Sequence, residues 1–98
     1  MNEFDHQQLD EMIHSRIRLA IMAVLITSEE AEFTYLREKV NTTDGNLSTH
    51  IKKLEDAGYV SVEKKFENRK PVTRFSLTEK GRKAFTIYIE RLENMLKK

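Results

Sequence analysis

The chain has 98 residues, with 17 lysine and arginine residues against 16 aspartate and glutamate residues and a net charge of +1. It contains no cysteine, so neither a disulfide nor a thiolate metal site can stabilise it, and we expect stability to depend on helix packing or on a partner chain. Its longest strongly apolar stretch, Leu19 to Ile26, is far shorter than the roughly 20 residues that span a bilayer, and the N-terminus has no signal-like pattern. We therefore expect one cytoplasmic domain over residues 1–98 that makes no membrane contact.

The charges are unevenly distributed along the chain. Residues 1–40 carry eight acidic and four basic side chains, whereas residues 41–98 carry thirteen basic and eight acidic ones. The densest positive stretch, Glu63 to Arg74, holds five basic side chains against two acidic ones. The near-neutral total argues against a nucleic-acid partner, but this local stretch is compatible with one; a solvated surface is the simpler alternative.

The first half of the chain predicts two helices. From Asp10 to Thr27 apolar residues recur at helical spacing and surround the helix almost completely, so we place it in the core. The polar residues 28–32 indicate a loop. Phe33 predicts a very short strand, and Thr34 is the expected cap of a short helix, Tyr35 to Val40. The expected buried side chains of that helix are Tyr35, Leu36 and Val40.

The second half predicts a helix, a β-hairpin and a last helix. Thr43 or Thr42 is a good N-cap for a helix that ends near Ala57, before a glycine that suits a left-handed C-terminal residue. The apolar stripe of this helix consists of Leu47, Ile51 and Leu54. A period-two pattern then predicts strands over residues 59–66 and 72–77, joined by a turn at Glu67 to Pro71. Thr78 caps a long helix that runs to the C-terminus.

Two motifs resemble those of a known family. The first, residues 43–60, reads Thr-x-x-Asn-Leu-Ser-Thr-His-Ile-x-x-Leu-Glu-x-Ala-Gly-Tyr-Val, and the second, residues 77–82, reads Leu-Thr-Glu-Lys-Gly-Arg. They resemble the recognition helix and the segment after the wing in ArsR-like and MarR-like transcriptional regulators, and the order of elements is similar to that of their short, stand-alone winged helix-turn-helix relatives. The resemblance implies an α+β, mainly α, winged-helix fold and binding to double-stranded DNA.

The predicted third helix presents short hydrogen-bonding side chains and two lysines away from its apolar stripe. Such groups can contact base edges or phosphates in a major groove, and a glycine there permits close approach of the backbone. From this helix we expect DNA contacts by Thr43, Gly45, Asn46, Ser48, Thr49, Lys52 and Lys53. The hairpin can reach a minor groove or flanking phosphates, and from it we expect contacts by Lys65, Arg69, Lys70 and Arg74, with Lys64 beside them.

Apolar residues near both ends of the chain have no evident core of their own. In the last helix they recur at intervals of four, three and four residues, which is typical of a seam with a partner helix. We expect them to form a homodimer interface of Leu9, Met12, Phe85, Tyr88, Ile89, Leu92 and Leu96, with Phe4 beside them. A two-fold dimer predicts a pseudo-palindromic site with half-sites about 10 base pairs apart.

Other chemistry is weakly indicated. His6, Asp10 and His14 would align on one helix face, as a metal site requires, but they lie near a terminus, and we expect no metal and no cofactor. His50 is expected to be a packed or hydrogen-bonded residue at the edge of its helix. The sequence has no paired nucleophile and base and no phosphate-binding loop, so we expect no enzyme. Two alternatives stay open: a winged-helix module that binds a protein instead of DNA, and a regulator with a small-molecule site at its dimer interface.

Overall fold

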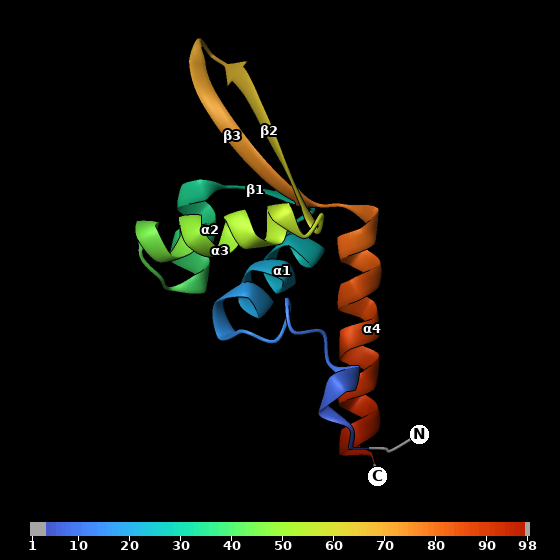
Figure 1. The fold of residues 1–98 in the computed structure, drawn as a ribbon. Helices are drawn as coiled ribbons and strands as arrows, with labels where there is room; N and C mark the ends of the chain where they lie inside the picture. The colour runs from blue at the N-terminus through green and yellow to red at the C-terminus, as the bar shows by residue number, and fades with distance from the viewer. Residues whose placement is uncertain (1–3, 98) are drawn as a thin grey trace.

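The computed structural model describes residues 4–97, and their elements follow the predicted winged-helix order (Figure 1). The fold is α+β and mainly helical. The elements are a short 3-10 helix, η1 (His6–Gln8), then α1 (Arg16–Ser28), β1 (Glu30–Glu32), α2 (Phe33–Val40), α3 (Asp44–Asp56), β2 (Val60–Glu67), β3 (Lys70–Leu77) and α4 (Glu79–Leu96).

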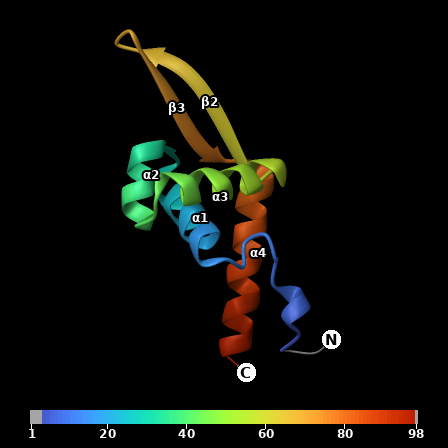
Figure 2. The ribbon, with the colours of Figure 1, turned by 60° about the vertical axis from the view of Figure 1, so that its left-hand side comes forward.

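The three strands form an antiparallel sheet in the order β1-β3-β2. β2 and β3 pair along their whole length, whereas β1 pairs only with Arg74–Ser76 of β3. The outer part of the hairpin is therefore a two-stranded ribbon, which we call the wing, and it projects from the helices (Figures 1 and 2). Its loop has two residues, Asn68 and Arg69, with φ values of 51° and 64°, as a type I′ turn requires.

The predicted turn at Glu67 to Pro71 is too long. Glu67 pairs with Lys70, and Pro71 stays in β3 opposite Phe66. A proline is tolerated there because β1 does not extend to this part of β3, so no neighbouring strand needs its missing amide hydrogen.

The first helix begins later than predicted. Ser15 is its N-cap and accepts a hydrogen bond from the backbone N–H of Arg18, while Asp10 accepts one from the backbone N–H of Met12 at 2.8 Å and so forms a separate turn. His6, Asp10 and His14 consequently share no helix face. Among residues 4–97, no three histidine, aspartate or glutamate side chains gather in a way that suits a metal ion.

The segment after α1 is also more regular than predicted. Residues 30–32 form β1 rather than a loop, because Ala31 points inward and is buried while its two neighbours point outward. α2 begins at Phe33, so Thr34 is not its cap. Leu36 is buried as predicted, but Tyr35 is exposed, with the ammonium of Lys39 over its ring.

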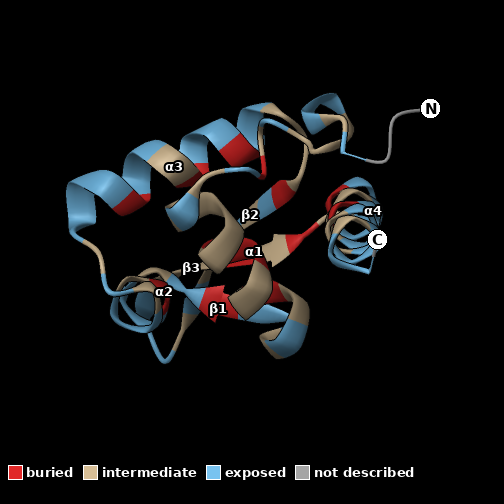
Figure 3. Ribbon diagram, turned by 90° about the horizontal axis from the view of Figure 1, so that it is seen from below, coloured by how far each residue is buried: buried red, intermediate tan, exposed pale blue. Residues whose placement is uncertain are grey.

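The core lies between the helices and the inner face of the sheet, with α1 in the middle (Figure 3). The predicted stripe Leu47, Ile51 and Leu54 faces this core, and all three side chains are buried. α4 meets the body through its first half, and its second half extends away from the sheet (Figure 1). The molecule is accordingly elongated, 54 by 25 by 21 Å.

No helix within residues 4–97 is long and apolar enough to cross a membrane.

Candidate nucleic-acid interface

The exposed face of α3 carries the residues predicted for it. Thr43 caps the helix by accepting a hydrogen bond from the backbone N–H of Asn46 at 3.2 Å. The buried stripe fixes the rotation of α3, so the polar residues of the other face point to solvent (Figure 3). The exposed residues include Thr43, Gly45, Asn46, Ser48, Thr49, Lys52 and Lys53.

The charges on α3 are partly compensated. Arg37 of α2 binds the carboxylate of Asp44 at 2.7 Å, and this partner raises the pKa of the guanidinium. Lys52 binds Asp56 one turn further along at 2.6 Å, which raises the pKa of the ammonium. Lys53 makes no ion pair within residues 4–97.

His50 is half-buried at the edge of α3, as predicted. Its Nδ1 lies 3.0 Å from Nη1 of Arg18 in α1. Because an arginine keeps its protons, Nδ1 must accept this hydrogen bond. Burial first, and then the charges of Arg18 and Lys53, lower the pKa of His50. The neutral imidazole therefore joins α3 to α1.

The wing has two chemically different faces, because side chains alternate along each strand. We call inner the face that lies on the same side of β2 and β3 as the core residues Val60, Val62, Phe75 and Leu77. Beyond the helices it carries Lys64, Phe66, Pro71 and Thr73 and no acidic residue. The outer face carries Glu63, Lys65, Glu67, Lys70 and Arg74, and β1 adds Glu30 and Glu32 to it.

Arg74 is surrounded by carboxylates on this outer face. Its guanidinium lies 2.7 Å from Glu67, 3.5 Å from Glu32 and 3.8 Å from Glu30. These partners raise the pKa of Arg74, and its hydrogen bond lowers the pKa of Glu67. Only 24% of the Arg74 side chain is exposed. The predicted DNA contact of Arg74 would therefore have to compete with these carboxylates.

Lys65 is also paired, with Glu63 at 3.0 Å and Glu67 at 3.8 Å. In contrast, Lys64, Arg69 and Lys70 form no ion pair with any residue that the structure describes. The wing thus presents fewer unpaired cations than its sequence suggests, and they lie on its inner face and at its tip.

The second motif joins α4 to the end of α3. Thr78 caps α4 by accepting from the backbone N–H of Gly81, and its hydroxyl donates to the carbonyl of Gly58 at 2.6 Å. Gly58 has a φ of 81°, as predicted for the glycine that follows this helix. Lys80 donates to the carbonyl of Ala57 at 2.9 Å. A Cβ on Gly81 would lie 2.2 Å from the carbonyl oxygen of Tyr59, so only glycine fits there.

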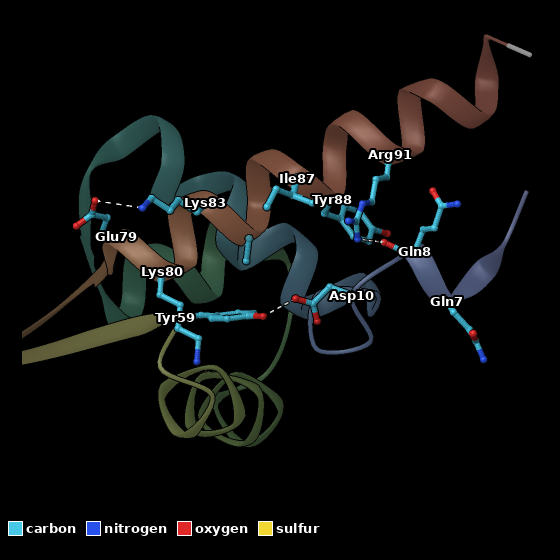
Figure 4. Close-up of a pocket in the computed structure, with 11 residues that line it drawn as sticks. Gln7, Gln8, Asp10, Tyr59, Glu79, Lys80, Lys83, Ile87, Tyr88 and Arg91 are labelled. Carbon is cyan, nitrogen blue, oxygen red and sulfur yellow. Dashed lines mark hydrogen bonds and ion pairs between the residues drawn. The ribbon is translucent and has the colours of Figure 1, made fainter. Parts of the chain in front are cut away.

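A groove of about 710 Å³ lies between η1, Tyr59 and α4 (Figure 4). Within it the hydroxyl of Tyr59 donates a short hydrogen bond to Asp10, and burial together with this carboxylate raises the pKa of Tyr59 to about 12. Arg91 donates to the carbonyl of Gln8 at 2.9 Å. These contacts fold the N-terminal segment back against α4, which the sequence did not reveal.

Most of the predicted dimer residues pack on their own chain. Tyr88 is buried and its hydroxyl lies 2.8 Å from Nδ1 of His14, while the side chains of Leu9, Met12, Phe85, Ile89 and Leu92 are partly buried against the core. The premise that they lack a core was wrong, because the N-terminal segment and the body cover them. Leu96 is 77% exposed and Phe4 is 62% exposed, and Ile87, which the prediction omitted, is 44% exposed.

A model of the winged helix DNA-binding domain matches residues 17–96. The chain belongs to this family. This winged-helix chain is 44% identical over 79 residues to the uncharacterised protein MJ0432 of Methanocaldococcus jannaschii, covering 81% of the chain and 86% of that protein. It is 34% identical over 68 residues to YdgJ, an uncharacterised HTH-type transcriptional regulator of Bacillus subtilis, covering 69% of the chain and 41% of YdgJ.

Solved structures agree with this assignment. A transcriptional regulator homologue from Pyrococcus horikoshii OT3 superposes with a TM-score of 0.89 at 27% identity, covering 99% of the winged-helix chain and 96% of that structure. A MarR-family regulator from Enterococcus faecalis V583 shares the fold, with a TM-score of 0.76 at 19% identity over 84% of this chain and 74% of that one. The family and fold are those of DNA-binding transcriptional regulators, not of enzymes.

Proposed function

We propose that this winged-helix chain is a homodimeric regulator that reads a pseudo-palindromic DNA site. The N-terminal half of α3 enters the major groove, and the wing lies over the neighbouring backbone or minor groove. Support comes from the face of α3, whose exposed residues are short and polar. No exposed large apolar side chain lies on α3, which is described in full, so this face has nothing that favours a protein partner over DNA.

Gly45 is the observation that carries the proposal. It lies in the first turn of α3, where a glycine disfavours the helix relative to an alanine. No atom of the protein lies within 4 Å of the position of a Cβ there, and φ is not positive, so neither packing nor backbone conformation requires glycine. A close approach of DNA to the helix N-terminus does account for it, because the free N–H groups there attract phosphate.

The electrostatics of the interface are compatible with this placement. Arg37 neutralises Asp44, the only acidic side chain in the first turn of α3. Lys53, Lys64, Arg69 and Lys70 have no carboxylate partner in the part of the chain that the structure describes, so phosphates can bind them without breaking an ion pair. We therefore assign the phosphate contacts to these four cations ahead of Lys65 and Arg74.

Dimerisation belongs to the same proposal. The far half of α4 has the N-terminal segment beside it (Figure 1), and exposed apolar side chains lie on α4 or near it, at Phe4, Ile87 and Leu96. A second copy packed along α4 covers them and sets two α3 helices about one helical turn of DNA apart. Residues 1–98 then act as one cytoplasmic DNA-binding domain with dimerisation segments at both ends, and no cofactor takes part.

The experiment is selection of bound duplexes from a random pool, followed by affinity measurements over a range of salt. We expect a two-fold symmetric site, and log affinity that falls with log salt by about 0.9 per phosphate contact. Replacing both Arg69 and Lys70 with alanine lowers that slope by nearly two. Lys65→Ala is the matched control on the same ribbon, and it leaves the slope unchanged because Lys65 is paired on the outer face. Absence of enrichment, or affinity that is independent of salt, contradicts DNA binding.

A further inference from the structure

Phe66 has no structural reason to be aromatic. It lies in the wing and is 78% exposed, and it pairs across the ribbon with Pro71. The core residues of the sheet end at Val62 and Phe75, and the exposure of Phe66 shows that little of the protein packs over its ring. A solvent-exposed aromatic ring contributes little to folding, which makes contact with another molecule its best physical explanation.

The surroundings of Phe66 indicate the chemistry of that molecule. The face of the wing that bears Phe66 has no acidic residue and carries Lys64, while Arg69 lies in the turn at the tip and Lys70 next to it on the outer face. None of these three cations has an ion-pair partner among residues 4–97. Carboxylates gather on the opposite face instead, around Arg74. An apolar wedge among unpaired cations complements a polyanion with apolar surfaces, and duplex DNA offers both phosphates and the stacked faces of its bases.

The wing can hold Phe66 in a fixed position. The two-residue turn keeps the strands paired up to the tip. Arg74 forms ion pairs both with Glu67, near the tip, and with the two glutamates of β1. Four residue pairs, from Lys64 with Thr73 to Glu67 with Lys70, extend past the end of β1. At about 3.3 Å per residue the ribbon therefore projects by about 10–13 Å, which exceeds the depth of a minor groove, about 7.5 Å.

We propose that Phe66 enters the minor groove beside the major-groove site of α3, partly unstacks one base step there and bends the duplex. The inference rests on the proposed DNA binding and adds a source of specificity to it. Pyrimidine–purine steps such as TA and CA/TG unstack and kink most easily, so the wing selects such a step without hydrogen-bonding to its bases. Lys64, Arg69 and Lys70 hold the flanking phosphates.

The test measures the bend of the selected duplex by energy transfer between dyes at its two ends. The wild-type protein bends the duplex by at least about 20°. Phe66→Ala abolishes the bend and lowers the affinity about tenfold, because the buried apolar contact is lost. Phe66→Leu keeps most of the bend because leucine still provides an apolar wedge. Val72→Ala, on the opposite face of the same ribbon, leaves both the bend and the affinity unchanged.

A second selection, with Phe66→Ala, separates this inference from DNA binding itself. We expect the two half-sites to persist while the preference for a flanking pyrimidine–purine step disappears. If Phe66→Ala bends the duplex as the wild type does, the wedge is overturned and DNA binding stands. If the wild type enriches no duplex, the proposed function fails and the wedge fails with it. A change in sedimentation of the DNA-free protein on Phe66→Ala assigns the ring to contact between copies and also overturns the wedge.

Discussion

Two glycines of this chain show how single residues separate the demands of the fold from those of the function. Gly81 is required by the fold, because a Cβ there meets the backbone of Tyr59. Gly45 faces open space, so the fold alone would accept a side chain. Helical periodicity predicts that Gly45 lies away from the apolar stripe of its helix, but only the structure shows that the protein itself leaves room there.

Gly45→Ala is therefore expected to move stability and DNA binding in opposite directions. The free energy of unfolding rises by about 0.5–1 kcal/mol, because alanine favours the helix and meets no neighbour. DNA affinity falls about tenfold, since the added methyl group holds the helix away from the groove. Urea denaturation measures the first change and fluorescence anisotropy with the selected duplex the second. Wild-type affinity in this variant would show that α3 does not approach DNA closely at this residue.

Residue partners on different elements are the part of the site that the sequence did not reveal. The exposed face of α3 follows from the spacing of Leu47, Ile51 and Leu54, a local property of the helix. The pairing of Arg74 with Glu30 and Glu32 depends on the register of β1 against β3. β1 has only three residues, too few to show the alternation of apolar and polar residues that predicts a strand. The sequence therefore predicts a loop for its two glutamates.

At the scale of elements, the junction between α3 and α4 determines how the recognition helix and the wing are set relative to each other. Three residues at the start of α4 contact the segment that links α3 to β2. The hydroxyl of Thr78 and the ammonium of Lys80 donate hydrogen bonds to it, and Gly81 packs against its backbone. The motif that resembles the segment after the wing in the MarR-like regulators thus has a packing role here. Its cap at Thr78 was predictable from local sequence, whereas its contacts with residues 57–59 required the fold.

Gly81→Ala is expected to destabilise the fold through this junction. The new methyl group would overlap a backbone carbonyl, which cannot move as a side chain can, so α4 must shift. A loss of about 2–3 kcal/mol in the free energy of unfolding follows from such overpacking. Urea denaturation checks the value, with Lys83→Ala, two residues along the same helix and exposed, as the control. An unchanged midpoint would mean that α4 is not held against Tyr59.

At the scale of the whole molecule, the length of α4 is the feature that the monomer does not explain. The helix completes the core through Tyr88, near its midpoint, and the part beyond it extends the molecule to a length of 54 Å. The sequence predicted the amphipathic character of α4 correctly. It could not distinguish apolar residues that pack on the N-terminal segment of the same chain from those that stay exposed, because both follow the same helical period.

Leu96→Glu tests the proposed dimer with little risk to the fold, because 77% of this side chain is exposed. We expect a monomer at micromolar concentration in sedimentation velocity, since a carboxylate would replace an apolar contact at the interface. The circular dichroism spectrum stays that of the wild type, and affinity for the symmetric site falls because the half-sites are bound one at a time. Glu93→Gln, one turn earlier, is the control. A dimer that survives Leu96→Glu places the interface elsewhere.

The two-residue loop at the end of the wing also fixes the register of β2 against β3. Successive side chains of a strand point to opposite sides of the ribbon. One residue inserted into β2 would therefore move the side chains between the insertion and the loop to the opposite side. A residue inserted between Lys64 and Phe66 would put Phe66 on the side of Glu63 in place of Lys64. Asn68 and Arg69, both with positive φ, close the ribbon with a two-residue loop and so keep this register. The length of this turn thereby decides whether Phe66 lies beside the unpaired Lys64 or beside a carboxylate.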